Sequence, residues 1–206
     1  MYTPSDFKIT DPGVIRKFIK ENSFGILVSS VDGSKIQETH TPLLLSEDGN
    51  FVLGHLARAN SHWRDWEKNP QVKIIFHGPH CYVSPSFYTS DFNVPTWNYT
   101  AVSIEGIVEI IQSITEQREF MRQLVEENEA AFPSPWNLDE ADERFIKLFS
   151  AVVFFKVRID HLEAKFKLNQ NKSEEDRLGV IKRLEASNSS FEQAVAQLMK
   201  ADLTQD

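Results

Sequence analysis

The chain has 206 residues, of which 41% are hydrophobic and 25% are charged, enough to bury one full core. Thirty acidic and 22 basic residues give a formal net charge of −8, which disfavours direct binding of a phosphate backbone. No apolar run reaches the length of a membrane span, and residues 1–4 lack the regions of a signal peptide, so we expect a cytoplasmic protein without a membrane partner.

The first half of the chain predicts one helix followed by short strands. Asp11 and Pro12 have the character of an N-cap and a first helical position. Asn60 can cap a short helix that carries two tryptophans and stops before Pro70. Pro42 places its strand at an edge or a bulge. The predicted strands cover residues 24–30, 36–45 and 51–56, with turns at 32–33 and 47–50.

The second half predicts more strands and a helix that starts with a capping box at Ser113. Gly78 and Pro79 suggest a connection between two strands, and Gly106 suggests a bulge or bend in a long one. The predicted strands cover residues 71–76, 81–84, 101–111 and 152–159. The longest irregular connection, 131–143, is a candidate lid or dimer-contact loop.

This order of elements predicts the fold class. Many short strands with few helices between them favour a mainly β, α+β protein built on an antiparallel barrel, and disfavour a parallel βαβ sheet. We expect the barrel in residues 1–160. Residues 161–206 would form a C-terminal basic segment and two helices that pack on the barrel or on a dimer interface, so that the whole chain is one structural unit.

The C-terminal segment is basic and rich in amides within an acidic protein. Lys165, Lys167 and Lys172 lie in this stretch, before a helix that Ser173 can cap. The segment is interpreted either as an element that faces an anion or as a solvated loop between the barrel and its packing helices. Charge pattern alone favours the loop.

Residues 94–99 (VPTWNY) combine a stiff turn with groups that can hold a flat polar ring. Pro95 restricts the backbone, so the segment loses little entropy on binding. Trp97 and Tyr99 offer faces for stacking, and Asn98 offers a donor and an acceptor. The motif alone favours a strand-edge turn whose tryptophan caps the core.

The sequence points to no catalytic residue and no metal ligand. The six histidines form no HExxH motif, no serine stands in a G-x-S-x-G elbow, and no carboxylate pair stands out. Cys81, the single cysteine, excludes an internal disulfide framework, and its apolar strand suggests a small core residue.

Taken together, five blocks of sequence resemble the PaiB-type family of FMN-binding negative transcriptional regulators, in order and spacing over nearly the whole chain. The blocks are 39–43 (THTPL), 54–60 (GHLARAN), 77–84 (HGPHCYVS), 95–99 (PTWNY) and 165–177 (KFKLNQNKSEEDR). The resemblance implies a bacterial flavoprotein with the FMN-binding split β-barrel fold, flanking helices, a C-terminal helical extension and a homodimer that holds FMN at its interface.

The resemblance also implies which residues bind the cofactor. His40 and Thr41 would donate to phosphate or ribityl oxygens, and the family's C-terminal signature would lie near FMN or lock the tail over the interface. The implied cofactor-binding residues are His40, Thr41, His55, Arg58, Asn60, Thr96, Trp97, Asn98, Lys167, Gln170, Asn171 and Arg177. The strand motif with which pyridoxamine-phosphate oxidases hold the FMN phosphate is missing, which disfavours that activity.

Two functions follow from this resemblance. In the first, a flavin-binding homodimer represses genes for degradative enzymes and sporulation, contacting DNA directly or through a partner protein. In the second, the protein is a flavin-dependent oxidoreductase that passes electrons from NAD(P)H to flavin or a small acceptor. A scaffold with a vestigial pocket is a third interpretation. The regulator is favoured because the sequence shows no acid, base or nicotinamide motif.

Overall fold

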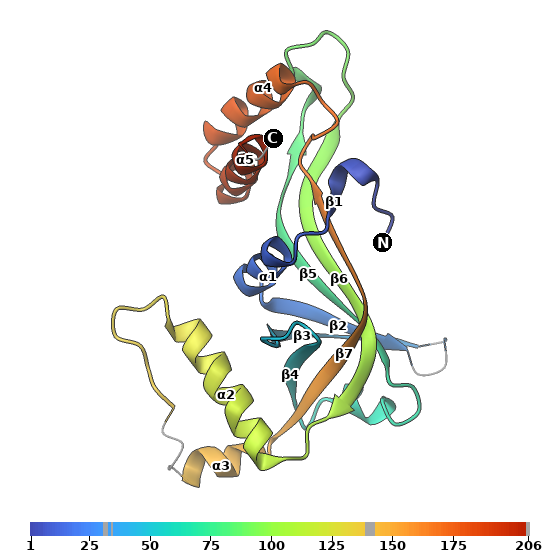
Figure 1. The fold of residues 1–206 in the computed structure, drawn as a ribbon, viewed down its shortest axis with the longest axis vertical. Helices are drawn as coiled ribbons and strands as arrows, with labels where there is room; N and C mark the ends of the chain where they lie inside the picture. The colour runs from blue at the N-terminus through green and yellow to red at the C-terminus, as the bar shows by residue number, and fades with distance from the viewer. Residues whose placement is uncertain (31–32, 34, 139–142, 205–206) are drawn as a thin grey trace. The chain divides into compact units, whose positions relative to one another are not determined.

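The computed structural model describes residues 1–30, 33, 35–138 and 143–204 (Figure 1). The chain forms two compact units, each assembled from segments far apart in the sequence. Unit 1 comprises Met1–Phe18, Phe76–Ser103 and Glu163–Asp206, and unit 2 comprises Ile19–Ile75 and Ile104–Leu162. The predicted C-terminal segment therefore belongs to the same unit as the N-terminus and the 94–99 motif.

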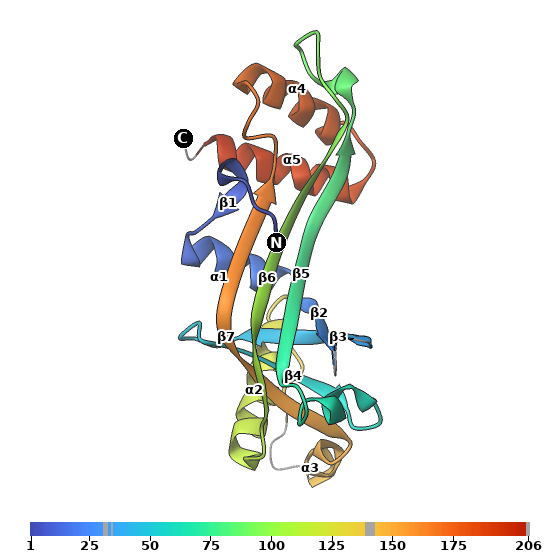
Figure 2. The ribbon, with the colours of Figure 1, turned by 90° about the vertical axis from the view of Figure 1, so that its right-hand side faces the viewer.

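Seven strands form one antiparallel sheet that closes on itself. Its order is β1-β7-β4-β3-β2-β5-β6, and β6 also pairs with β7. Figure 2 shows β6 between β5 and β7. The strands are β1 (Lys8–Ile9), β2 (Phe24–Ser30), β3 (Ile36–Leu45), β4 (Phe51–Ala57), β5 (Gln71–Val83), β6 (Thr96–Ile110) and β7 (Val152–Lys167). The predicted antiparallel barrel is confirmed.

Helices flank the sheet and begin at the predicted caps. Asp11, Asn60, Ser113 and Ser173 each accept a hydrogen bond from a backbone N–H in the first turn that follows. The helices are η1 (Ser5–Phe7), α1 (Pro12–Glu21), η2 (Ser61–Asp65), η3 (Pro85–Phe87), α2 (Ile114–Glu129), α3 (Glu143–Phe149), α4 (Glu174–Glu185) and α5 (Ser190–Leu203). Within the described residues, none of these helices is both long and apolar enough to span a membrane.

Each unit has its own apolar core. In unit 2, Phe120 and Leu124 of α2 pack with Leu44, Ile111 and Phe154. In unit 1, α4 packs against α5, and the apolar faces of both helices are buried. Burial of these faces supplies most of the stability of such short helices, since isolated helices of this length are marginal in water.

Three strands are longer than predicted: β6 begins at Thr96, inside the expected 94–99 turn, and β5 and β7 run through expected connections. β5 runs without interruption through Gly78 and Pro79, where a connection was expected. An added Cβ at Gly78 would overlap the hydroxyl of Thr100 and approach the ring of Phe18 to 2.6 Å, so the glycine serves close packing and not a turn. β7 continues from Val152 to Lys167, so part of the expected loop is a strand.

The other predicted connections are only partly described. Asp32 lies outside the described residues, while Gly33 has the positive φ, 81°, that a tight turn requires. Residues 130–138 carry no helix or strand, and 139–142 lie outside the described residues. A lid or dimer-contact role for this connection stays a prediction.

Gly106 offers a test of the packing between β6 and β7. It lies inside β6, and an added Cβ would overlap the backbone carbonyl of Arg158 and approach the Val157 side chain to 2.9 Å. We expect Gly106→Ala to lower the free energy of unfolding by about 1–3 kcal/mol or more, because a backbone carbonyl cannot swing aside. Chemical denaturation of the wild type and the variant measures this difference in the free energy of unfolding.

Gly13→Ala is the matched control for that substitution. Gly13 lies in the first turn of α1, and its added Cβ would meet only the tip of the Asp11 side chain, at 3.1 Å. Equal effects of the two substitutions on unfolding would show that the approach of the Arg158 carbonyl does not constrain the fold.

Candidate functional site

In unit 1, Trp97 lies on an exposed aromatic surface near the start of β6. Its side chain is 54% exposed, and its ring centroid lies 6.2 Å from that of His80 and 6.1 Å from that of Tyr82. Phe191 of α5 packs 5.1 Å from His80 and is equally exposed. We call His80, Tyr82, Trp97 and Phe191 the Trp97 surface. Such a surface can accept a flat ring by stacking.

The ammonium group of Lys167 lies beside Trp97. Its Nζ donates to the backbone carbonyl of Trp97 at 2.7 Å and to the hydroxyl of Thr96. Both acceptors are uncharged, and no carboxylate pairs with Lys167 among the described residues. Partial burial, and then the charge of Lys165, lower the pKa of Lys167. An anionic or carbonyl oxygen at this position would therefore gain a charge-assisted hydrogen bond.

Asn98 lies on the opposite face of β6 from Trp97. It is fully buried, and its Nδ2 donates weakly to the sulfur of Met199 at 3.4 Å. Its Oδ1 is buried without a hydrogen-bond partner. Because successive strand residues face opposite sides, a ring that stacks on Trp97 does not reach Asn98 in this conformation.

The C-terminal signature mostly makes contacts inside unit 1. Gln170 accepts from the backbone N–H of Leu168 at 2.7 Å and donates to the carbonyl of Phe166 at 2.8 Å. Arg177, which is 4% exposed, pairs with Asp202 near the end of α5. Asn171 is exposed. Gln170 and Arg177 thus tie the tail together within unit 1, and their predicted place near FMN or over a dimer interface stays a prediction.

Asp176 anchors the segment that leads to the Trp97 motif. Its carboxylate accepts from the backbone N–H groups of Thr89 and Ser90, both at 2.9 Å, and from their hydroxyls at 3.0 and 2.8 Å. These hydrogen bonds lower the pKa of Asp176 to about 2, and those from Ser90 contribute most. Sequence reasoning missed this anchor because 87 residues separate Thr89 from Asp176.

In unit 2, two of the predicted cofactor residues have internal partners. The Thr41 hydroxyl is buried and donates to the carbonyl of His55 at 2.7 Å. The His55 ring packs against Phe120 and Phe154, and its Nδ1 is buried without a partner. Burial lowers the pKa of His55, so the imidazole is neutral near pH 7. His40, by contrast, is exposed.

Arg58 and Asn60 lie between β4 and η2. Arg58 donates to the carbonyls of Ser150 and Val152 at 2.7 and 2.8 Å and stays exposed, with Trp63 5.9 Å away. It has no carboxylate partner in the described part of the chain. Asn60 caps η2 and donates to Thr39 at 3.0 Å. Arg58 therefore keeps a charge to offer, while the amide of Asn60 is already occupied.

A buried polar cluster near Asn60 was not predicted. His62 is 1% exposed, and its two ring nitrogens lie 2.8 Å from Ser29 Oγ and 2.9 Å from Thr39 Oγ1. Burial is the main cause of the lowered pKa of His62. Ser29 and His62 resemble the serine and histidine of a hydrolytic triad, but the Thr39 hydroxyl takes the place of the carboxylate. We therefore assign this cluster a structural role.

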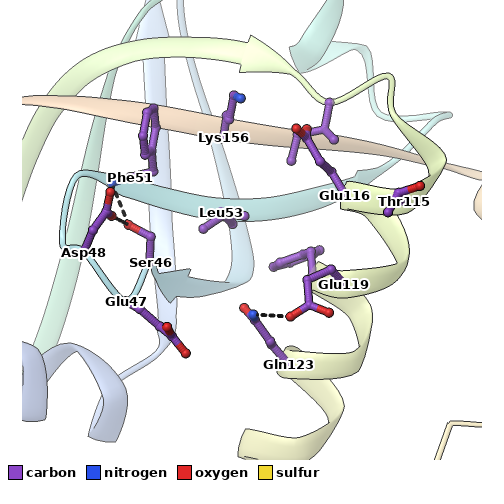
Figure 3. A pocket seen from close by; sticks show the side chains of 12 residues that line it. Ser46, Glu47, Asp48, Phe51, Leu53, Thr115, Glu116, Glu119, Gln123 and Lys156 are labelled. Carbon is purple, nitrogen blue, oxygen red and sulfur yellow. Dashed lines mark hydrogen bonds between the residues drawn. The ribbon is translucent and has the colours of Figure 1, made fainter.

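Unit 2 also contains a cavity of about 550 Å³ (Figure 3). The turn between β3 and β4 forms one side, and helix α2 forms the other. The residues that line it are Ser46, Glu47, Asp48, Phe51, Leu53, Ile111, Thr115, Glu116, Glu119, Phe120, Gln123 and Lys156. None of the predicted cofactor residues is among them. Among the described residues, those of the cavity included, no three His, Cys, Asp or Glu side chains group as a metal site would require.

The closed sheet and its flanking helices define a split-barrel protein of the FMN-binding kind. A family model described as "Putative FMN-binding domain" matches residues 1–161, and the chain belongs to that family, with the PaiB-type proteins. Protease synthase and sporulation protein PAI 2 of Bacillus subtilis is 34% identical over 206 residues, which cover 98% of each chain.

Solved structures confirm the fold. A FAD and heme binding protein from Mycobacterium smegmatis matches with a TM-score of 0.61 at 11% identity, over 83% of this chain and 78% of that one. A conserved hypothetical protein from Mycobacterium tuberculosis matches with a TM-score of 0.60 at 12% identity, over 83% of this chain and 92% of that one. At such low identity these likenesses concern the fold alone.

The Asp176 anchor predicts a pH dependence. A carboxyl whose pKa falls on folding, from about 4 to about 2, stabilises the fold above pH 4, and this contribution is lost as the pH falls through 2. Asp176→Asn should lower the melting temperature at pH 6, and its difference from the wild type should shrink between pH 4 and pH 2. Asp91→Asn, at an exposed position, is the control. A constant difference at all pH values would contradict the anchor.

Proposed function

We propose that this protein binds FMN and acts as a cytoplasmic, homodimeric regulatory flavoprotein of the PaiB type, which represses genes for degradative enzymes and sporulation. Membership of the FMN-binding family supports the cofactor. The regulatory role is supported by 34% identity, over nearly the whole chain, to a protein whose name refers to protease synthesis and sporulation.

The observation that carries flavin binding is the pairing of an exposed indole with a cation that has only neutral partners. Trp97 offers a ring face, and Lys167 holds its ammonium group at the Trp97 carbonyl. The isoalloxazine ring needs an apolar wall and hydrogen-bond donors for its carbonyl oxygens, and these two residues have that chemistry. Bound FMN would supply a ring that accepts electrons.

The phosphate requires charged or polar donors, and the sequence assigns it to the first two blocks. Of those residues, His40 is exposed, and Arg58 is exposed with N–H groups left beyond the two that donate to backbone carbonyls, whereas Thr41 uses its hydroxyl hydrogen on the His55 carbonyl. His40 and Arg58 are therefore the candidates of unit 2 that keep a group for an anion such as a phosphate. A role for Thr41 would require that hydrogen bond to break.

The structure favours an indirect action on DNA. Lys165 is 7% exposed, with its ammonium group donating to the carbonyl of Tyr2 and lying 5.1 Å from the ring of Tyr99. Lys172 donates to Asn93 at 2.7 Å. With Lys167 held at Trp97, these three lysines do not form an exposed basic face. A net charge of −8 also disfavours direct contact with DNA, so we favour contact through a partner protein.

The single thiol of the chain gives little support to the oxidoreductase alternative. Cys81 is buried, and burial raises its pKa to about 12, which makes it a poor nucleophile and a poor redox partner for a flavin. This agrees with its interpretation as a small core residue.

Trp97→Ala tests the ring contact. Loss of stacking worth about 1–3 kcal/mol should weaken FMN binding about 5- to 100-fold, while circular dichroism and melting temperature change little because the side chain is exposed. Quenching of flavin fluorescence on titration gives the affinity. Tyr2→Ala, which removes another exposed aromatic side chain, is the control. Equal affinities of the two variants would exclude Trp97 from the site.

The absorption spectrum of the FMN complex distinguishes regulator from enzyme. Under anaerobic conditions we expect the flavin band to persist after addition of NADH or NADPH, because no nicotinamide-binding motif is evident in the sequence. Bleaching on the time scale of enzyme turnover, about 10 per second, would establish the oxidoreductase instead. The same samples, analysed by light scattering, test the homodimer, and a monomeric mass would contradict it.

A further inference from the structure

The cavity in unit 2 has the size of a binding site. Its volume of about 550 Å³ lies within the range of small-molecule sites, roughly 300–1,000 Å³. The side chains of Phe51, Leu53, Ile111 and Phe120 give it an apolar floor. Figure 3 shows Leu53 at the centre, between the β3–β4 turn and helix α2.

The rim of this cavity is acidic on both sides. Glu47 and Asp48 lie on the turn, and Glu116 and Glu119 lie on α2 (Figure 3). Lys156 is the one basic residue that lines it, and its ammonium group lies 5.6 Å from the centre of the Phe51 ring. Four carboxylates therefore face one ammonium group around the opening.

The partners of Asp48 leave its negative charge uncompensated. Asp48 accepts from the Ser46 hydroxyl at 2.6 Å and from the Asn50 backbone N–H at 3.0 Å, both neutral donors. The Ser46 bond is the first cause of the lowered pKa of Asp48, so this carboxyl is ionised at neutral pH. Glu119, by contrast, pairs with Arg122 at 2.5 Å.

We propose that this cavity binds a small organic cation with an aromatic or alkyl body. The apolar floor would hold the body of the ligand, and the negative charges of Asp48 and Glu116, on the two sides of the opening, would attract its ammonium group. The same charge repels a phosphate, so FMN is excluded here. The proposal is therefore independent of flavin binding.

Protonated 2-phenylethylamine is a suitable probe, and 2-phenylethanol and 3-phenylpropanoate are its neutral and anionic analogues. We expect the amine to shift the backbone amide resonances of Leu53 and Thr115 in a saturable way, the alcohol to bind at least fivefold more weakly, and the carboxylate not to bind. Raising the salt concentration from 10 to 200 mM should weaken binding of the amine, because exposed charges are screened. Added FMN should not displace it.

Glu116→Gln removes one charge and keeps the shape and the helix start, since Ser113 accepts from the backbone of residue 116. We expect it to weaken amine binding about 2- to 5-fold, the range for one exposed ion pair. Asp48→Asn should act similarly, and both together should approach tenfold. Glu67→Gln, an exposed carboxylate outside the cavity, is the matched control and should change nothing.

Two results would overturn the proposal. One is the absence of saturable shifts with the amine at millimolar concentration in the folded wild-type protein. The other is equal binding of the amine and the alcohol, or equal effects of Glu116→Gln and Glu67→Gln, which would show that the carboxylates do not select the ligand. Neither result depends on whether the protein binds FMN.

Discussion

Pairing of β7 with β4 and β6 closes the sheet, and the other elements depend on that closure. β7 pairs with β4 from Val152 to Arg158 and with β1 further along at Ala164 and Lys165. Because β6 pairs back to β7, the ring leaves few unpaired strand edges that could recruit another chain. The closure also demands close backbone approach, which explains the glycine at position 106.

Charged and polar residues of the C-terminal segment act as internal supports in unit 1. Asp176 holds the segment at Thr89 and Ser90, Arg177 pairs with Asp202, and Lys167 fixes the start of β6. Buried charges persist only where partners offset their desolvation. The basic, amide-rich stretch is thus chiefly a scaffold that presents Trp97, and Lys167 is the member that also retains charge for a ligand.

The two units differ in the ligand chemistry that they offer. Unit 1 presents aromatic rings beside an ammonium group without a carboxylate partner, which suits a flat, electron-poor ring with carbonyl oxygens. Unit 2 presents an apolar cavity with an acidic rim, which suits a cation. The chain's overall negative charge would not reveal this division, because net charge averages over surfaces that bind different molecules.

The sequence by itself determined the fold class, the helix starts and the family. Local signals suffice there, because a cap involves residues two or three positions apart and strand alternation needs no distant partner. The family followed from five blocks whose order and spacing are visible in the linear chain.

Only the tertiary structure decided what individual polar residues do. Thr41, Asn98 and Gln170 were all cofactor candidates in the sequence, yet each has a partner inside its own unit. The Asp176 anchor and the acidic cavity join segments that lie far apart in sequence. A single sequence does not show which distant groups satisfy one another, because hydrogen bonds and desolvation depend on positions that only packing sets.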